Sequence, residues 1–367
     1  MPLLPQELWD RTIDFLAPDC LSGPSKHYAD LHICALTCQS WLPRAQRQLY
    51  KHVELDRLES TRLLARTLEE SPDLCPFVKR LEFWCKKADW ESQLTPVGDV
   101  PFPAHLIGGL TALHSLRFAC CTDLPRHCEV QIDFVNKWRG FKQLRTLWLD
   151  GFCFDTLADL TRVIWSFPLL GELNVFQTTW GERNTSVDPA EFPGHCQMLT
   201  NVEMQETYGV DDLLPLLGRA IQTLSVAWMW DALNPDTYAA ISTLLDLRGI
   251  QIQINYLDYA WVASILFQIR SAHLEELVLD LSLLSRDEDS TVLEIFAKEG
   301  LDELLSHKPL DGIRRLRIIT FGNNKTGKAE RRRQEAQALL PQFMKRGTIE
   351  VAVEQKISGL TGEEYED

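Results

Sequence analysis

The chain has 367 residues, 45% of them hydrophobic, and a formal net charge of −15. This length suggests about two globular domains, and the acidic balance argues against nucleic-acid binding, which depends on Lys and Arg neutralising phosphates. No apolar run reaches the roughly 20 residues that span a bilayer, and the segment from residue 1 to 7 lacks the basic and apolar regions of a secretory signal. We therefore expect a cytoplasmic or nuclear protein with no membrane partner, whose ten cysteines are free thiols.

The first fifty residues predict three short helices. Pro5 suits the first turn of a helix, and apolar residues follow it at helical spacing as far as Leu16. The stretch from Asp19 to Ala29 is polar and predicts a loop. Asp30 is a candidate N-cap for a second helix, and Pro43 begins a third. A unit of this size buries little surface by itself, so it favours a module that packs on a partner or on the rest of the chain.

Three short motifs occur in these helices: Leu-Pro-x-Glu-Leu-Trp from Leu4, the pair Asp30-Leu31, and Cys-x-x-Trp-Leu from Cys38. The segment resembles an F-box, the module by which substrate receptors dock on the Skp adaptor of cullin–RING ubiquitin ligases. The loop from Asp19 to Ala29 is longer than is usual in that family. By this resemblance, the residues expected to contact the adaptor are Leu4, Pro5, Leu8, Ile13, Leu16, Leu31, Cys34, Leu36 and Trp41.

A second pattern recurs after residue 75, where a pair of apolar residues separated by one position marks a short strand. The ten pairs are Leu81/Phe83, Leu116/Phe118, Leu147/Leu149, Leu173/Val175, Val202/Met204, Leu224/Val226, Ile250/Ile252, Leu277/Leu279, Leu316/Ile318 and Val351/Val353. The steps between them range from 22 to 39 residues, against about 20 to 29 in leucine-rich repeats. Segments with helical spacing lie between the strands, at 160–167, 238–245, 261–269 and 339–344.

Strands that alternate with helices at a near-constant step predict parallel strands with the helices on one side. Because no single unit buries its apolar face, the units must stack into a solenoid. The pattern resembles an irregular leucine-rich-repeat domain, and an ordinary α/β sheet domain is the alternative. We expect an α/β leucine-rich-repeat solenoid preceded by a small all-α F-box. The expected divisions are an F-box-like domain at 1–55, a connecting helix at 56–77, repeats at 78–355 and an acidic tail at 356–367.

In each strand the residue between the paired apolar positions and the residue after the second of them point away from the core. Exposed aromatic and arginine side chains there are typical anchors of protein interfaces. Trp84, Arg117, Trp148 and Phe176 gather in the first half of the repeats and form the predicted substrate-binding patch.

The sequence offers weak evidence for nucleotide binding, metal binding or catalysis. The segment Gly322–Lys328 matches the G-x-x-x-x-G-K pattern of a phosphate-binding loop. However, Ala329 replaces the hydroxyl residue that would hold Mg²⁺, and about forty residues remain after it. The cluster of His114, Cys120, Cys121, His127 and Cys128 lacks zinc-ligand spacing, and no catalytic motif stands out. We expect no enzyme activity, no cofactor and no metal.

The sequence therefore predicts a substrate-recognition subunit. Its F-box would dock on a Skp-type adaptor, and its repeats would present a protein target for ubiquitination by a cullin–RING ligase. One alternative is a repeat scaffold outside any ligase, whose F-box-like helices only cap the solenoid. A less favoured one is a nucleotide-binding protein that uses Gly322–Lys328. The sequence names no substrate.

Overall fold

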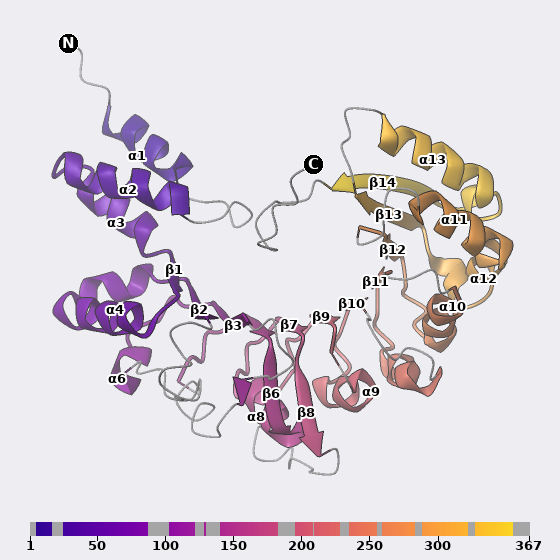
Figure 1. The fold of residues 1–367 in the computed structure, drawn as a ribbon, viewed down its shortest axis with the longest axis horizontal. Coiled ribbons are helices and arrows are strands. Elements are labelled where there is room, and N and C mark those ends of the chain that lie inside the picture. Colours follow the sequence, from indigo (N-terminus) through magenta and orange to yellow (C-terminus); the bar gives the residue numbers. More distant parts are fainter. Residues whose placement is uncertain are drawn as a thin grey trace. The chain divides into compact units, whose positions relative to one another are not determined.

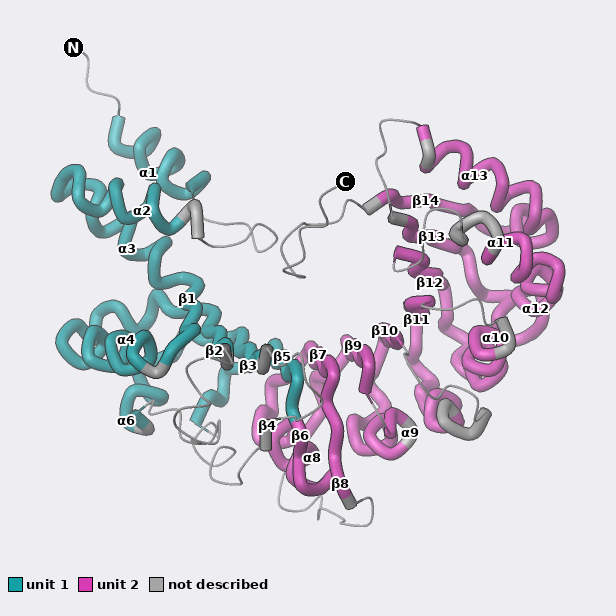
Figure 2. The backbone as a smooth tube through the Cα atoms, in the orientation of Figure 1, with its two compact units in different colours: residues 1–152, 361–367 teal, residues 153–360 magenta. Residues whose placement is uncertain are grey.

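The computed structural model describes residues 5–16, 25–86, 103–121, 128–129, 140–182, 195–207, 209–227, 235–254, 259–282, 288–321 and 327–354. It divides into two compact units, residues 1–152 with 361–367 (unit 1) and residues 153–360 (unit 2) (Figure 2). The expected division at residue 55 stays a prediction. No helix among the described residues is long and apolar enough to cross a membrane.

Unit 1 begins with helices and continues into parallel strands (Figure 1). Its helices are α1 (Gln6–Phe15), α2 (Ser25–Thr37), α3 (Leu42–Leu49), α4 (Leu58–Glu70), the 3₁₀ helix η1 (Pro72–Phe77) and α6 (Ala104–Ile107). Its strands are β1 (His52–Leu55), β2 (Arg80–Lys86), β3 (Ser115–Cys121), β4 (Cys128–Glu129) and β5 (Thr146–Asp150). The strands β1, β2, β3 and β5 pair in that order, all parallel.

Unit 2 alternates strands with helices. Its strands are β6 (Phe152–Thr156), which starts at the boundary, β7 (Glu172–Phe176), β8 (Thr179–Glu182), β9 (Asn201–Gln205), β10 (Thr223–Ala227), β11 (Gly249–Gln253), β12 (Glu276–Asp280), β13 (Arg315–Phe321) and β14 (Thr348–Glu354). Its α-helices are α8 (Leu157–Trp165), α9 (Val210–Leu213), α10 (Tyr259–Gln268), α11 (Glu288–Lys298), α12 (Leu301–Ser306) and α13 (Lys328–Leu339). Its 3₁₀ helices are η4 (Leu214–Leu217), η5 (Pro235–Thr243), η6 (Leu310–Gly312) and η8 (Phe343–Lys345).

Seven strands of unit 2 pair in the order β7-β9-β10-β11-β12-β13-β14, and each of these pairings is parallel. The strands β6 and β8 lie in a separate sheet, where they pair with each other in parallel. Helices α9 and α10 lie on one side of these strands (Figure 1). Within each unit the first apolar residue of a predicted pair stacks on its counterpart in the next strand, as Leu224 does on Ile250; the exception is β14, where Leu316 pairs with Ile349. Such a ladder buries a continuous core, and it confirms the predicted parallel solenoid.

One backbone hydrogen-bond pattern makes the repeats equivalent. The carbonyl of the residue before a strand accepts two hydrogen bonds, one from the amide just before the next strand and one from the first amide of that strand. For example, the Arg248 carbonyl accepts from Glu275 (2.8 Å) and Glu276 (3.1 Å). The other acceptors are Lys51, Lys79 and His114 in unit 1 and Gly171, Thr200, Gln222 and Glu275 in unit 2. Because each bond pair fixes where the next strand starts, the phase of the repeats is kept although their lengths differ.

Several local expectations need correction. Helix α2 starts at Ser25, so Asp30 lies inside it and is not its N-cap. The segment expected as a helix at 238–245 belongs to the 3₁₀ helix η5, and the one at 339–344 spans the end of α13 and the start of η8. In β14 the register pairs Ile349 with Leu316, so the buried position of this repeat is Ile349 rather than Val351.

Candidate protein-interaction surfaces

The helices α1, α2 and α3 share a small core of their own. Ile13, Leu31, Cys34 and Ala45 are buried in it, and Leu16 and Trp41 pack against it. The Trp41 ring lies 4.6 Å from the ring of Trp9. The predicted docking residues Ile13, Leu31 and Cys34 therefore hold the module together and do not reach its surface.

A polar link ties α1 to α3 across this core. Arg44 forms an ion pair with Asp14, and the Asp14 carboxylate also accepts a hydrogen bond from the Gln48 amide. The hydrogen bond from Arg44 lowers the pKa of Asp14. The Tyr28 hydroxyl of α2 donates to the His52 carbonyl at the start of β1. The helical module is thus anchored to the first strand of unit 1.

The outer faces of α1 and α2 carry exposed apolar side chains. Exposed fractions are 45% for Leu8, 88% for Phe15, 63% for Ile33 and 81% for Leu36. Pro5 is also exposed, while Leu4 lies outside the described residues. We call Leu8, Phe15, Ile33 and Leu36 the exposed apolar set.

Two members of this set, Phe15 and Ile33, were missed by the sequence prediction. The signal was present, because Leu8 and Phe15 are seven residues apart and Ile33 and Leu36 are three apart. Each spacing places two residues on one helix face, and that face differs from the one formed by Leu31 and Cys34.

A second candidate surface lies on the strands of unit 1, where the register aligns Glu82 with Arg117 and Arg117 with Trp148. The Arg117 guanidinium lies 4.6 Å from the centre of the Trp84 ring and 5.2 Å from that of Trp148. It also lies 3.2 Å from the Asp150 carboxylate. The structure therefore brings together three of the four residues predicted for the substrate patch.

The fourth predicted residue, Phe176, ends β7 in unit 2 and is half-buried. In unit 2 the strand surface is hollowed by a groove of about 400 Å³. Its lining includes Asn174, Glu203, Gln251 and Arg317, all of which occupy the position between the paired apolar residues. Burial raises the pKa of Glu203.

An acidic cluster adjoins the arginine–tryptophan stack. Glu82 is 2% exposed and accepts hydrogen bonds from His52 (2.9 Å) and the Trp84 indole (3.2 Å). Burial raises the pKa of Glu82, but the His52 hydrogen bond and the charges of Arg80 and Arg117 outweigh it, and the pKa lies below its usual value. Burial, together with the charge of Glu82, raises the pKa of Glu54.

His52, Glu54 and Glu82 offer ligand atoms within 4.8 Å of one another and are the described residues that could hold a metal ion. A metal ion there would compete with Arg80, whose Nε lies 2.6 Å from the same Glu82 oxygen that contacts His52. This arrangement fits a salt-bridged network better than a metal site, and the expected absence of a metal stays a prediction. Of the suspected phosphate loop, only Gly327 and Lys328 lie within the described residues.

No protein-family model matches the chain, and no curated protein matches it. A chain in the crystal structure of the TLR13–ssRNA13 complex aligns with 84% of this chain at 13% identity and a TM-score of 0.41. This chain covers 37% of the length of that one, and a similarity of this size carries no argument about ligands. Strand order, register and repeated hydrogen bonds therefore identify the protein as a mixed α/β chain whose parallel sheet resembles a leucine-rich-repeat solenoid.

Proposed function

We propose that this protein is a protein-interaction scaffold that serves as the substrate-recognition subunit of a cullin–RING ubiquitin ligase. Its helical module docks on a Skp-type adaptor, its strand surface binds a protein target, and it contributes no catalytic step. The ligase then acts by holding the target near the ubiquitin-transfer machinery. We place this function in the cytoplasm or nucleus.

The observation that carries the proposal is the exposed apolar set. Within the described residues, nine large hydrophobic side chains are exposed, and four of them lie on α1 and α2. Single exposed hydrophobic residues are normal, but a concentration of them marks an interaction surface. The resemblance of this segment to an F-box supports a Skp-type adaptor as the partner.

The arginine–tryptophan stack supports the second half of the proposal. Trp and Arg are the residues most enriched at energetic centres of protein interfaces. Trp84, Arg117 and Trp148 are half-buried, which leaves part of each side chain accessible to a target. Because Glu82 holds the Trp84 indole and Asp150 holds the Arg117 guanidinium, little side-chain entropy of these two residues would be lost on binding.

The docking half is tested by co-expression with a Skp adaptor and affinity purification. The test variant is Leu8→Asp/Leu36→Asp, and the matched control is Met198→Asp/Leu245→Asp, two exposed apolar residues of unit 2. We expect the wild type and the control to retain the adaptor and the test variant to lose it, with unchanged circular dichroism.

If the wild type does not retain the adaptor, the ligase proposal fails. A repeat scaffold outside any ligase, whose helices only cap the solenoid, then becomes the better account. If the test variant binds as well as the wild type, the exposed apolar set is not the docking surface.

A further inference from the structure

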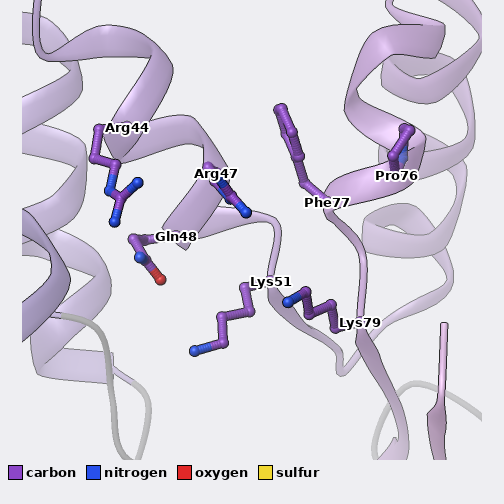
Figure 3. Close-up of a pocket in the computed structure, with 7 residues that line it drawn as sticks. All are labelled: Arg44, Arg47, Gln48, Lys51, Pro76, Phe77 and Lys79. Atoms are coloured by element: carbon purple, nitrogen blue, oxygen red, sulfur yellow. The ribbon is translucent and has the colours of Figure 1, made fainter. Parts of the chain in front are cut away.

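A pocket of about 400 Å³ lies in unit 1 between α3, the end of η1 and the start of β2 (Figure 3). Its lining includes Arg44, Arg47, Lys51, Pro76, Phe77 and Lys79. None of the described residues that line it is acidic. Four cationic side chains around one cavity are unexpected in a chain with a net charge of −15.

Three of these cations are available to a ligand. Arg44 is neutralised by Asp14. Over the described part of the chain, Arg47, Lys51 and Lys79 form no ion pair, and Arg47 and Lys51 are exposed. Figure 3 shows the Arg47 and Lys79 side chains extending from different segments into the same space. The charge of Arg47 also acts at longer range on Asp14 and helps to lower its pKa. The pocket is therefore a concave site in which three cations lack an ion-pair partner among the described residues.

The backbone holds this arrangement in place. The Lys51 carbonyl accepts hydrogen bonds from the amides of Lys79 (3.1 Å) and Arg80 (3.0 Å), so the backbones that carry the two lysines are held side by side. The positive potential extends to the next repeat: burial lowers the pKa of His114, and the charges of Lys79, Arg145, Arg80 and Lys51 lower it further. Like charges held together in this way repel one another, and a bound anion would relieve the repulsion.

We propose that this pocket binds a phosphorylated side chain of a partner protein. A phosphate monoester carries about −1.5 to −2 charges and three acceptor oxygens, which matches the three available cations. The Phe77 ring and Pro76 give one wall an apolar surface, suited to the carbon atoms of a side chain and not to a free anion. The proposal is independent of docking on a Skp adaptor, because it uses other residues.

The test measures binding of fluorescein-labelled peptide mixtures to the full-length protein by fluorescence anisotropy. The mixtures carry a fixed central phosphoserine, phosphotyrosine or serine between randomised flanking residues. The test variant is Lys51→Gln/Lys79→Gln. The control, Lys298→Gln/Lys345→Gln, removes the same charge from two exposed lysines of unit 2.

We expect at least one phosphorylated mixture to bind about tenfold or more tightly than the serine mixture, the size that a hydrogen bond to a charged group supports. The test variant should lose this difference, and the control should keep it. Arg47→Gln, a single exposed change, should weaken phosphopeptide binding severalfold and guards against misfolding of the double variant.

Three results would overturn the proposal. The first is equal binding of the phosphorylated and serine mixtures. The second is equal loss in test and control variants, which would indicate a general charge effect. The third is competition by inorganic phosphate at the same concentration as phosphopeptide, which would show that the pocket recognises only the anion.

Discussion

The position of Arg117 between two tryptophan rings allows a quantitative prediction. Replacing Arg117 with Met keeps most of the aliphatic stem, which packs along the strand surface, and removes the guanidinium. The change thus deletes the two cation–π contacts, at 4.6 Å from Trp84 and 5.2 Å from Trp148, and the ion pair with Asp150.

The expected loss follows from these contacts. A cation–π pair at a partly exposed site contributes about 0.5–1 kcal/mol, so the two together give about 1–2 kcal/mol. The Arg117–Asp150 pair, with side chains 19% and 26% exposed, adds about 0–1 kcal/mol after solvent screening. We therefore expect Arg117→Met to lower the free energy of unfolding of unit 1 by about 1–3 kcal/mol.

The assay is urea unfolding followed by tryptophan fluorescence, a signal to which Trp84 and Trp148 contribute together with the other nine tryptophans of the chain. The control is Arg145→Met, which removes an exposed arginine just before β5 and should change stability by less than about 0.5 kcal/mol. A double-mutant cycle with Trp148→Leu should give a coupling free energy of about 0.5 kcal/mol or more. Equal stability of the two arginine variants, or a coupling of zero, would refute the assignment of a clamped arginine.

Three further predictions concern stability. Ile13→Ala should lower the free energy of unfolding by about 2–5 kcal/mol because the side chain is buried. The exposed Leu36 is the control, and Leu36→Ala should change the same quantity by less than about 0.5 kcal/mol. Equal destabilisation of the two variants in thermal melts would contradict the assigned burial. Burial raises the pKa of Glu203 in the folded state, so wild-type stability declines as the pH rises from the unfolded pKa near 4.3 through the folded one. Glu203→Gln should therefore raise the free energy of unfolding at pH 7, and raise it less at pH 4. Urea titrations at both pH values test this: the same difference between variant and wild type at pH 7 and pH 4 would contradict it. Asp302→Ala should cost about 1–3 kcal/mol, because the Asp302 carboxylate accepts the backbone amides of Gln342 (2.9 Å) and Phe343 (2.8 Å); an unchanged urea midpoint would contradict this.

The repeat architecture was predictable because its cause is local. Each strand buries alternate residues, and this period of two is written directly in the sequence. All ten predicted pairs lie on strands, and nine of them are fully buried. The exception is the last, Val351/Val353, which is half-buried. There Ile349 fills the core position. Because Ile349, Val351 and Val353 alternate along the same strand, the sequence did not show which two of them form the buried pair.

The helical connections were less predictable because helical spacing does not distinguish helix types. The apolar residues of 238–245 are spaced equally well for an α-helix or a 3₁₀ helix, and tertiary packing settles on the latter in η5. Helix α2 begins five residues before Asp30, within a stretch whose polar composition indicated a loop. Local propensity is a weak prior in such segments, and tertiary contacts override it.

The candidate surfaces show the same division between local and non-local information. The alignment of Arg117 with Trp148 follows from the phase of two predicted strands, so the central part of the patch was accessible to sequence reasoning. The Glu82 network was not, because it depends on His52 in β1, a strand of only four residues with no leucine-rich pattern before it. A short strand becomes visible only through its pairing with a longer one.

The helical module shows why a family resemblance and a burial pattern answer different questions. The resemblance treats the apolar positions of the three helices as one docking set, but a small module must also bury some of them to fold at all. The structure separates the two roles: Leu31 and Cys34 close the core, while Ile33 and Leu36 face outward on the same helix. Fully burying a leucine contributes about 1.5–3 kcal/mol, and Leu36, 81% exposed, retains most of that gain for a partner. Docking energy should therefore reside in the residues that the module leaves exposed, and substitutions there can separate binding from folding.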